Sequence, residues 1–217
     1  MNIHRRILIM TSVEAERGVI LRGIGNDSRF DVMLAGVGPI SAGIQTTKAL
    51  AASKYDLVIN MGIAGGFVDK AEIGSLVIAN EIVSADLGAE SPEGFITLDE
   101  LGFGASTRVK TDGDLVEVLL ESSKGAGLSV RAGNILTLSS VTGTAETSLK
   151  LQLREPGALA EAMEGYGVAI AAKEFGVPVL EIRSISNPIG PRDRSAWRIK
   201  DALVTLESAS KVIVEVL

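Results

Sequence analysis

The chain has 217 residues, of which 46% are apolar and 4% aromatic, and it contains 24 glycines, no cysteine and one histidine. Its formal net charge of −6 argues against a nucleic-acid partner, which requires clustered lysine and arginine, and the few aromatic side chains argue against stacking on single-stranded bases. The absence of cysteine excludes thiolate chemistry, and a single histidine argues against a His-based zinc site or catalytic triad. The length and apolar content fit one domain covering residues 1–217.

The N-terminal segment carries Arg5 and Arg6 before an apolar run, as a secretory signal does. That run, residues 7–10, is too short for a signal, and Glu14 and Glu16 follow it closely. No other stretch approaches the ~20 apolar residues that cross a bilayer. We therefore expect a soluble, cytoplasmic protein with no membrane partner.

Strand-like and helix-like segments alternate along the chain. Apolar runs and helical spacings predict, in chain order, strand 7–11, helix 13–24, strand 30–34, helix 40–52, strand 57–61, strand 76–83, helix 112–124, strand 132–139, helix 161–175, strand 179–185 and helix 201–216. Short apolar strands separated by helices indicate a mostly parallel sheet covered on both faces. We predict an α/β fold, a three-layer α/β/α sandwich with a central mixed, mostly parallel sheet. The polar, glycine-rich segment 86–110 is predicted to be a functional loop or excursion.

Two glycine-rich stretches follow predicted strands. Gly36 and Gly38 open a helix, but the dinucleotide-binding fingerprint requires a third glycine where this chain has Ser41, so a structural turn is favoured. The stretch 60–66, Asn-Met-Gly-Ile-Ala-Gly-Gly, follows the third strand at the edge where open α/β sheets bind ligands. It is either a place of close backbone approach to a ligand or a tight turn.

Acidic residues stand where two predicted helices begin. Glu14 and Glu16 follow the first strand and either stabilise the helix dipole or include a general base. Glu161 and Glu164 both fall in the first turn of the predicted helix 161–175, where an acid stabilises the helix dipole. Gly165 and its neighbour two residues on lie inside this helix at an energetic cost, which a ligand or close helix packing would explain.

The strand 179–185 contains Arg183 and becomes polar where it ends, at Asn187. A buried arginine needs an acidic partner. An asparagine before Pro188 either stops a strand or supplies a functional amide. One arginine, two or three acids and an asparagine at one edge of a sheet indicate a site.

These residues, together with the surrounding motifs, resemble the purine nucleoside phosphorylase/nucleosidase superfamily over almost the whole chain. Within it, the sequence is most similar to the branch that hydrolyses futalosine. The motifs are Thr-Ser-Val-Glu-Ala-Glu at 11–16, Ala-Gly-Val-Gly at 35–38, the stretch 60–66, Ala-Asp-Leu-Gly-Ala-Glu at 85–90, Ser-Val-Thr-Gly-Thr at 140–144, Met-Glu-Gly at 163–165, Arg-Ser-Ile-Ser-Asn at 183–187 and Arg-Asp-Arg-Ser-Ala-Trp at 192–197.

The resemblance implies hydrolysis of the N-glycosidic bond of futalosine, releasing hypoxanthine and dehypoxanthine futalosine in menaquinone biosynthesis. It implies no metal, no cofactor, and assembly into a homo-oligomer. Glu16 would deprotonate the attacking water, Glu164 would bind the ribose hydroxyls with Met163 packing on the sugar, and Arg183 would hold the water and acids in place. The other implied substrate-binding residues are Ala64, Gly65, Val141, Thr142, Thr144, Ser186, Arg192 and Arg194.

Asn187 departs from the adenine-specific relatives, which have an aspartate here that protonates the purine N7. Asparagine supplies no proton, but it accepts a hydrogen bond from N7–H while its NH₂ donates to O6. This pattern favours hypoxanthine over adenine as leaving group, because only complementarity to the transition state accelerates the reaction. Ile63, where those relatives have serine, is a second departure.

Futalosine carries a carboxyphenyl tail, and arginine binds carboxylates through two parallel hydrogen bonds. Arg192 and Arg194 are candidates for this contact, with Arg108 as a third, and the alternative for the first two is a solvated or interface loop. Other activities also fit the sequence: an inosine/guanosine or methylthioadenosine type of nucleosidase or phosphorylase, or a nucleoside-binding module without catalysis.

Overall fold

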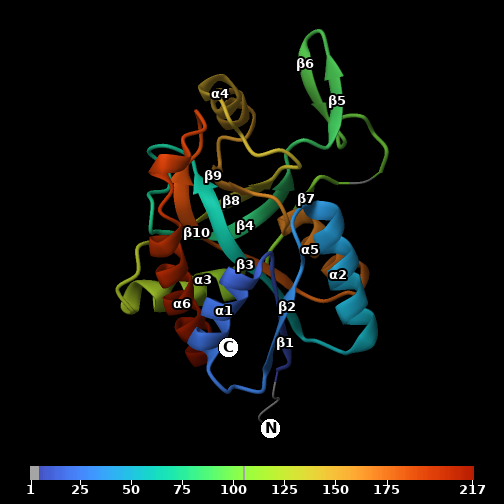
Figure 1. The fold of residues 1–217 in the computed structure, drawn as a ribbon. Coiled ribbons are helices and arrows are strands. Elements are labelled where there is room, and N and C mark those ends of the chain that lie inside the picture. Colours follow the sequence, from blue (N-terminus) through green and yellow to red (C-terminus); the bar gives the residue numbers. More distant parts are fainter. Residues whose placement is uncertain (1–4, 105) are drawn as a thin grey trace.

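The computed structural model describes residues 5–104 and 106–217 (Figure 1). Its elements, in chain order, are β1 Ile7–Thr11, α1 Glu14–Ile24, β2 Phe30–Leu34, α2 Pro39–Ala52, β3 Leu57–Gly66, β4 Leu76–Ser84, β5 Gly88–Ser91, β6 Gly94–Thr97, β7 Arg108–Lys110, α3 Gly113–Gly125, β8 Val130–Thr137, α4 Ala145–Arg154, β9 Ala158–Ala162, α5 Gly165–Glu174, β10 Val179–Pro188, the 3₁₀ turn η1 Arg194–Ala196 and α6 Ile199–Val216.

The main sheet follows the order β10-β4-β8-β9-β3-β1-β2, with β7 paired to β4. Strand β3 is the organising strand, because it pairs with β1 and β10 in parallel and, at its far end, with β9 in the antiparallel sense. The pairs β1–β2, β4–β8 and β8–β9 are also parallel, whereas β10–β4 and β4–β7 are antiparallel. The predicted mixed, mostly parallel sheet is therefore confirmed.

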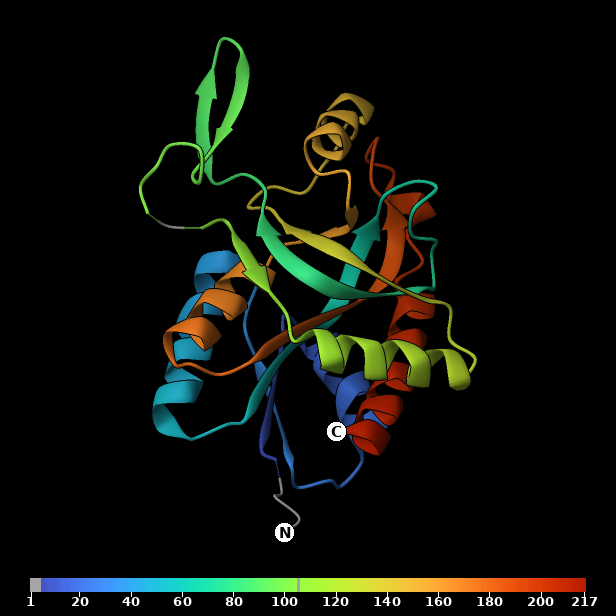
Figure 2. The same cartoon turned by 180° about the vertical axis from the view of Figure 1, so that it is seen from behind.

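Helices cover both faces of the sheet, which confirms the predicted three layers (Figures 1 and 2). Alternate residues of β1 point to opposite faces. Leu8 belongs to the apolar core shared with α2 and α5, and Ile9 to the core shared with α1, α3 and α6. Among the residues that the structure describes, no helix has both the length and the apolar character required to cross a bilayer.

The predicted helix 161–175 begins too early. Residues 158–162 form strand β9, inserted between β8 and β3, and the helix α5 starts only at Gly165. Glu161 is thus a strand residue and not a first-turn acid. The alanine-rich sequence of β9 has helical propensity, and pairing with two strands distant in the sequence overrides it. Helix α4 was absent from the prediction.

The segment 86–110 is more regular than predicted. It forms the hairpin β5–β6 and the short strand β7, and the hairpin projects away from the body of the molecule in both views (Figures 1 and 2). Strand β3 also extends to Gly66, so that the stretch 60–66 lies inside a strand and not in a loop after it. Its backbone pairs with β10 along the whole stretch, while β1 reaches only Asn60 and β9 pairs only with Gly65 and Gly66.

Candidate active site

Arg183 lies on β10 at the centre of a group of buried acids. The side chain is 1% exposed, and its Nε donates to Glu181 Oε1 at 2.8 Å while Nη2 donates to Glu164 Oε2 at 3.2 Å. Because side chains alternate along a strand, residues 181 and 183 share one face of β10. The expectation that Arg183 has a buried acidic partner is confirmed twice over.

Glu164 is the residue immediately before helix α5, and its carboxylate is also buried. Its Oε1 accepts a hydrogen bond from the backbone N–H of Gly38, in the turn that opens α2, at 3.2 Å. Close packing accounts for the two glycines of α5. A Cβ added at Gly165 would overlap the Glu181 carboxylate, and one at Gly167 would overlap the Pro39 carbonyl.

Glu16 is buried at the start of α1, whereas Glu14 is solvent-exposed and pairs with Arg17. The Thr11 hydroxyl and the next two backbone N–H groups donate to Glu16 Oε2 at 3.0 to 3.2 Å, and Ile63 N donates to Oε1 at 2.8 Å. Among the described residues, Oε1 receives only this one bond, so it keeps a lone pair for another donor.

Gly62 on β3 separates Glu16 from Arg183. A Cβ added at Gly62 would lie 2.7 Å from Glu16 Oε1 and 2.7 Å from Arg183 Nη1, so the two side chains occupy the space above this glycine. We refer to Glu16, Glu164, Glu181 and Arg183 as the acid cluster.

The acid cluster holds three carboxyl groups against one guanidinium. Burial raises the pKa of Glu181, and the neighbouring charge of Glu164 adds to this, although Arg183 opposes it. Burial lowers the pKa of Arg183, but the surrounding carboxylates outweigh it and raise that pKa above its ordinary value. Glu181 Oε2 has no hydrogen-bond partner among the described residues. The cluster therefore favours a further positive charge beside it.

A second group of polar side chains lies three residues further along β3, at Gly65. Gly65 pairs with Asn187 across β3–β10 and with Glu161 across β3–β9. A register shift in β10 between Ile185 and Asn187 brings the asparagine into this row. The cavity here has a volume of about 60 Å³, and we call it the amide pocket; it is lined by Gly65, Val141, Thr142, Glu161, Asn187, Pro188, Gly190, Pro191, Arg192 and Trp197.

Asn187 and Glu161 face the amide pocket from opposite strands. The Ser186 hydroxyl lies 2.9 Å from Asn187 Oδ1, and Asn187 Nδ2 donates to the Pro188 carbonyl at 3.0 Å. Glu161 accepts from Thr142 N at 2.8 Å and from the Thr142 hydroxyl at 2.6 Å. Burial raises the pKa of Glu161, although the two bonds from Thr142 oppose this. The pocket thus offers an amide on one side and a carboxyl group on the other.

Comparison with known proteins identifies the family. The family model described as the phosphorylase superfamily matches residues 11–217. The chain belongs to the phosphorylase superfamily. A futalosine hydrolase from Streptomyces coelicolor is 45% identical over 223 residues, 94% of this chain and 92% of that protein. A 5'-methylthioadenosine/S-adenosylhomocysteine nucleosidase from Haemophilus influenzae is 28% identical over 180 residues, 82% of this chain and 76% of that protein.

The solved structure of futalosine hydrolase from Helicobacter pylori has the same fold. The TM-score is 0.85 at 21% identity, and the match covers 100% of this chain and 100% of that chain. The sequence relatives identify the chain as a nucleosidase of the phosphorylase superfamily. The solved structure shows that such proteins have the three-layer α/β/α fold predicted from the sequence.

Most of the residues that the superfamily resemblance indicated gather at these two places. Glu16, Glu164 and Arg183 meet in the acid cluster, and half-buried Met163 directly precedes Glu164. Other predicted residues line or border the amide pocket, namely Ala64, Gly65, Val141, Thr142, Ser186, Asn187 and Arg192.

Three residues predicted to bind substrate either lie outside these two places or are already bonded to other side chains. Thr144 caps helix α4, where its hydroxyl accepts from Thr147 N at 3.1 Å. Arg194 lies over the ring of Trp197, 5.8 Å from its centroid, and lines a separate cavity of about 450 Å³ with Arg198. Both nitrogens of the Arg108 fork are taken by carboxylates, Nη2 by Glu81 at 2.6 Å and Nη1 by Glu155 at 2.8 Å, so Arg108 is a structural arginine. No group of described side chains is arranged to bind a metal ion.

Two acids of the site were missed in the sequence. Glu181 could have been found from strand alternation, since it precedes Arg183 by two residues. Glu161 was assigned to a helix, and nothing local in the alanine-rich segment reveals its strand.

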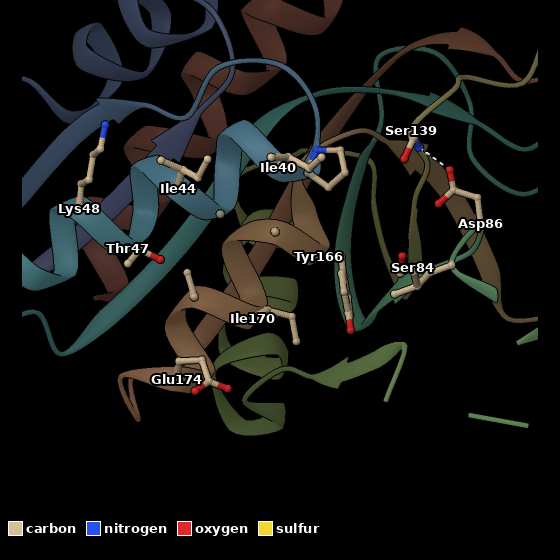
Figure 3. A pocket seen from close by; sticks show the side chains of 15 residues that line it. Ile40, Ile44, Thr47, Lys48, Ser84, Asp86, Ser139, Tyr166, Ile170 and Glu174 are labelled. Atoms are coloured by element: carbon tan, nitrogen blue, oxygen red, sulfur yellow. Dashed lines mark hydrogen bonds between the residues drawn. The ribbon is translucent and has the colours of Figure 1, made fainter. Parts of the chain in front are cut away.

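A larger apolar groove lies outside these two places. Its volume is about 690 Å³, and it runs between α2, which carries Ile40 and Ile44, and α5, which carries Tyr166 and Ile170 (Figure 3). Asp86 closes one end, where its Oδ2 accepts from Ser139 N at 2.6 Å. Ile40 is 79% exposed, which is high for a large apolar side chain on a helix.

Proposed function

We propose that this chain hydrolyses futalosine at its N-glycosidic bond and so releases hypoxanthine and dehypoxanthine futalosine, a step of menaquinone biosynthesis. The observation that carries the proposal is that one strand, β10, supplies both Arg183, which binds the buried acids, and Asn187, which lines the amide pocket. The 45% identity to the futalosine hydrolase of Streptomyces coelicolor supports the choice of substrate.

The acid cluster supplies the chemistry in this proposal. Cleavage moves the bonding electrons from C1′ onto the purine and leaves positive charge on the ribose ring, which nearby carboxylates stabilise. Glu16 Oε1, with its remaining lone pair, takes the proton of the attacking water as the oxygen bonds to C1′. Overall, hydroxide is added to C1′ and a proton to the base.

Glu164 and Met163 hold the sugar. A carboxylate accepts two hydroxyl donors, which suits the adjacent 2′- and 3′-hydroxyls of ribose. Arg183 keeps Glu164 oriented through the bond at 3.2 Å, and Glu181 acts through Arg183 as a positioning residue. The three carboxyl groups around one guanidinium disfavour a phosphate nucleophile by like-charge repulsion, and this supports hydrolysis over phosphorolysis.

Asn187 selects the leaving base. Its Oδ1 accepts from N7–H, and its NH₂ donates to O6 of hypoxanthine. The amide pocket, at about 60 Å³, is smaller than the roughly 300–1,000 Å³ of typical ligand pockets. We propose that the base enters beside the segment 188–197, which contributes to the lining of the pocket.

Arg192 and Arg194 are proposed to bind the carboxylate of the tail. Their guanidinium groups stack on Trp197 at 5.2 and 5.8 Å and make no ion pair with any residue in the described parts of the chain. This leaves their hydrogen-bond donors available, in contrast to those of Arg108.

The proposal includes a homo-oligomer that buries the groove between α2 and α5. Exposed apolar patches of this kind mark interaction sites. The variant Ile40→Glu is expected to shift the sedimentation of the protein towards the monomer. Residues 1–217 act as one domain in this proposal, since the site draws on elements from β1 to β10. A cytoplasmic location stays a prediction.

One assay tests the function. Purine release is measured from futalosine, inosine and methylthioadenosine, each with and without phosphate. We expect hypoxanthine from futalosine without any need for phosphate. Preferential cleavage of methylthioadenosine, the activity named for the relative from Haemophilus influenzae, would contradict the proposal. If the protein binds futalosine but releases no hypoxanthine, it is a nucleoside-binding module without catalysis, and the proposal is wrong.

A further inference from the structure

Glu161 is a buried carboxyl group that the proposed reaction does not use. It forms one row with Gly65 and Asn187 across three strands. A Cβ added at Gly65 would lie 3.4 Å from Asn187 Nδ2 and 3.7 Å from Glu161 Cγ. The amide and the carboxyl group therefore approach the same small volume from two sides.

The Glu161 carboxylate is oriented but not saturated. Thr142 donates its N–H to Oε1 and its hydroxyl to Oε2. A carboxylate has about four acceptor positions, and these are its only hydrogen bonds to the residues the structure describes. Each oxygen keeps acceptor capacity, and the residue lines the amide pocket while being only 4% exposed. Such a group is held ready for one more donor.

The two kinds of purine base differ at the edge next to the one that Asn187 reads. Hypoxanthine presents O6 as an acceptor and N1–H as a donor. Adenine presents its 6-amino group as a donor and N1 as an acceptor. With Asn187 on N7 and the 6-position, the next ring atom is N1. A carboxylate at N1 accepts a hydrogen bond from hypoxanthine and repels the N1 lone pair of adenine.

We propose that Glu161 is a specificity-determining residue that accepts a hydrogen bond from N1–H of a 6-oxopurine base. The base is then read by a pair, the Asn187 amide at N7 and O6 and the Glu161 carboxylate at N1. Thr142 positions this carboxylate. The inference rests on the proposed function for the nucleoside, but binding of the free base tests it without catalysis.

The test is the variant Glu161→Gln, with two readouts. Calorimetry measures the affinity for hypoxanthine and for adenine. Turnover measures kcat/KM for futalosine and for aminodeoxyfutalosine, which differ only at the 6-position. We expect hypoxanthine to bind about ten- to a hundredfold more weakly, since a hydrogen bond to a charged group is lost. Adenine should bind more tightly, because the new amide NH₂ donates to N1. The kcat/KM value should fall for futalosine and rise for aminodeoxyfutalosine.

Glu155→Gln is the matched control, because Glu155 is also buried, at 8% exposure, but pairs with Arg108 away from the pocket. It should leave the ratio of the two affinities unchanged. If Glu161→Gln lowers the affinity for both bases by the same factor, Glu161 only holds Thr142 in place and the inference is overturned. An unchanged ratio, or a wild-type protein that binds neither base, also overturns it. A wild-type protein that binds hypoxanthine through Glu161 but cleaves no nucleoside would refute the proposed function alone.

Discussion

The two halves of the site are built in different ways. The acid cluster is buried in the sheet, where the side chains of Arg183 and Glu181 are 1% and 0% exposed and hold each other in place. The amide pocket has its polar groups on strand ends, but its outer wall comes from connecting segments, with Val141 41% exposed and Arg192 at the surface. One half is fixed by strand register, and the other is partly formed by loops.

Under the proposed function, this difference separates the residues that carry the chemistry from those that recognise the base. Catalytic groups must be oriented before the substrate arrives, and neighbours in a sheet achieve this. Recognition of a base and its tail requires a way in, and the pocket's outer wall, in the segments 139–144 and 188–197, contains no residue of the acid cluster. We therefore expect substitutions in the acid cluster to affect rate and stability, and substitutions in the amide pocket to affect selectivity.

The largest expected effect is on rate. Glu16→Gln removes the proposed general base, and we expect kcat for futalosine to fall by about 10²–10⁴-fold. Hypoxanthine affinity, measured by calorimetry, should stay close to the wild-type value because the amide pocket is untouched. Circular dichroism and urea unfolding serve as folding controls. An equal loss of hypoxanthine affinity would contradict the separation of the two halves.

Stability should distinguish the same two regions. Arg183→Met leaves three buried carboxyl groups without their cation, and we expect a loss of about 3–5 kcal/mol in the free energy of unfolding. Arg192→Met, the matched change in the amide pocket, should alter it by no more than about 0.5 kcal/mol, since Arg192 is exposed. Urea titration measures both. Similar losses for the two variants would show that the pocket wall is as constrained as the sheet.

The sequence predicts the acid cluster better than the pocket, and the reason is physical. Glu16 and Glu164 stand out locally as acids at helix starts, and Arg183 as a charged residue inside an apolar strand, while their roles follow from the resemblance to the superfamily. Glu181 is also local, because strand alternation places it on the same face of β10 as Arg183, two residues away.

Glu161 could not be found in this way. Its strand β9 is made of residues that favour helices, and it exists because β8 and β3 pair with its two edges. The meeting of Glu161 with Asn187 depends on pairing between strands distant in sequence and on the register shift in β10. Such non-local contacts carry no signal in a single sequence.

Selectivity should change in the amide pocket without a comparable loss of rate. Asn187→Asp removes the NH₂ that donates to O6, so the preference for futalosine over aminodeoxyfutalosine should fall by about ten- to a hundredfold. The ratio of the two kcat/KM values measures this. Glu155→Gln, which changes a buried carboxyl group paired with Arg108 away from the pocket, is expected to keep the preference. An unchanged ratio in Asn187→Asp would refute the role of the amide.

The smallest expected effect concerns pH. Burial raises the pKa of Glu181 above its ordinary value of 4.5, so the unfolded chain loses this proton at lower pH than the folded chain. Between the two pKa values the folded state binds more protons, and stability falls as pH rises, by up to about 1.4 kcal/mol per pH unit. Glu181→Gln has no proton to lose there. Urea unfolding from pH 4.5 upward should therefore show the variant gaining stability relative to the wild type as pH increases. Parallel pH profiles would mean that Arg183 keeps Glu181 ionised throughout, and that the acid cluster is held by ion pairing alone.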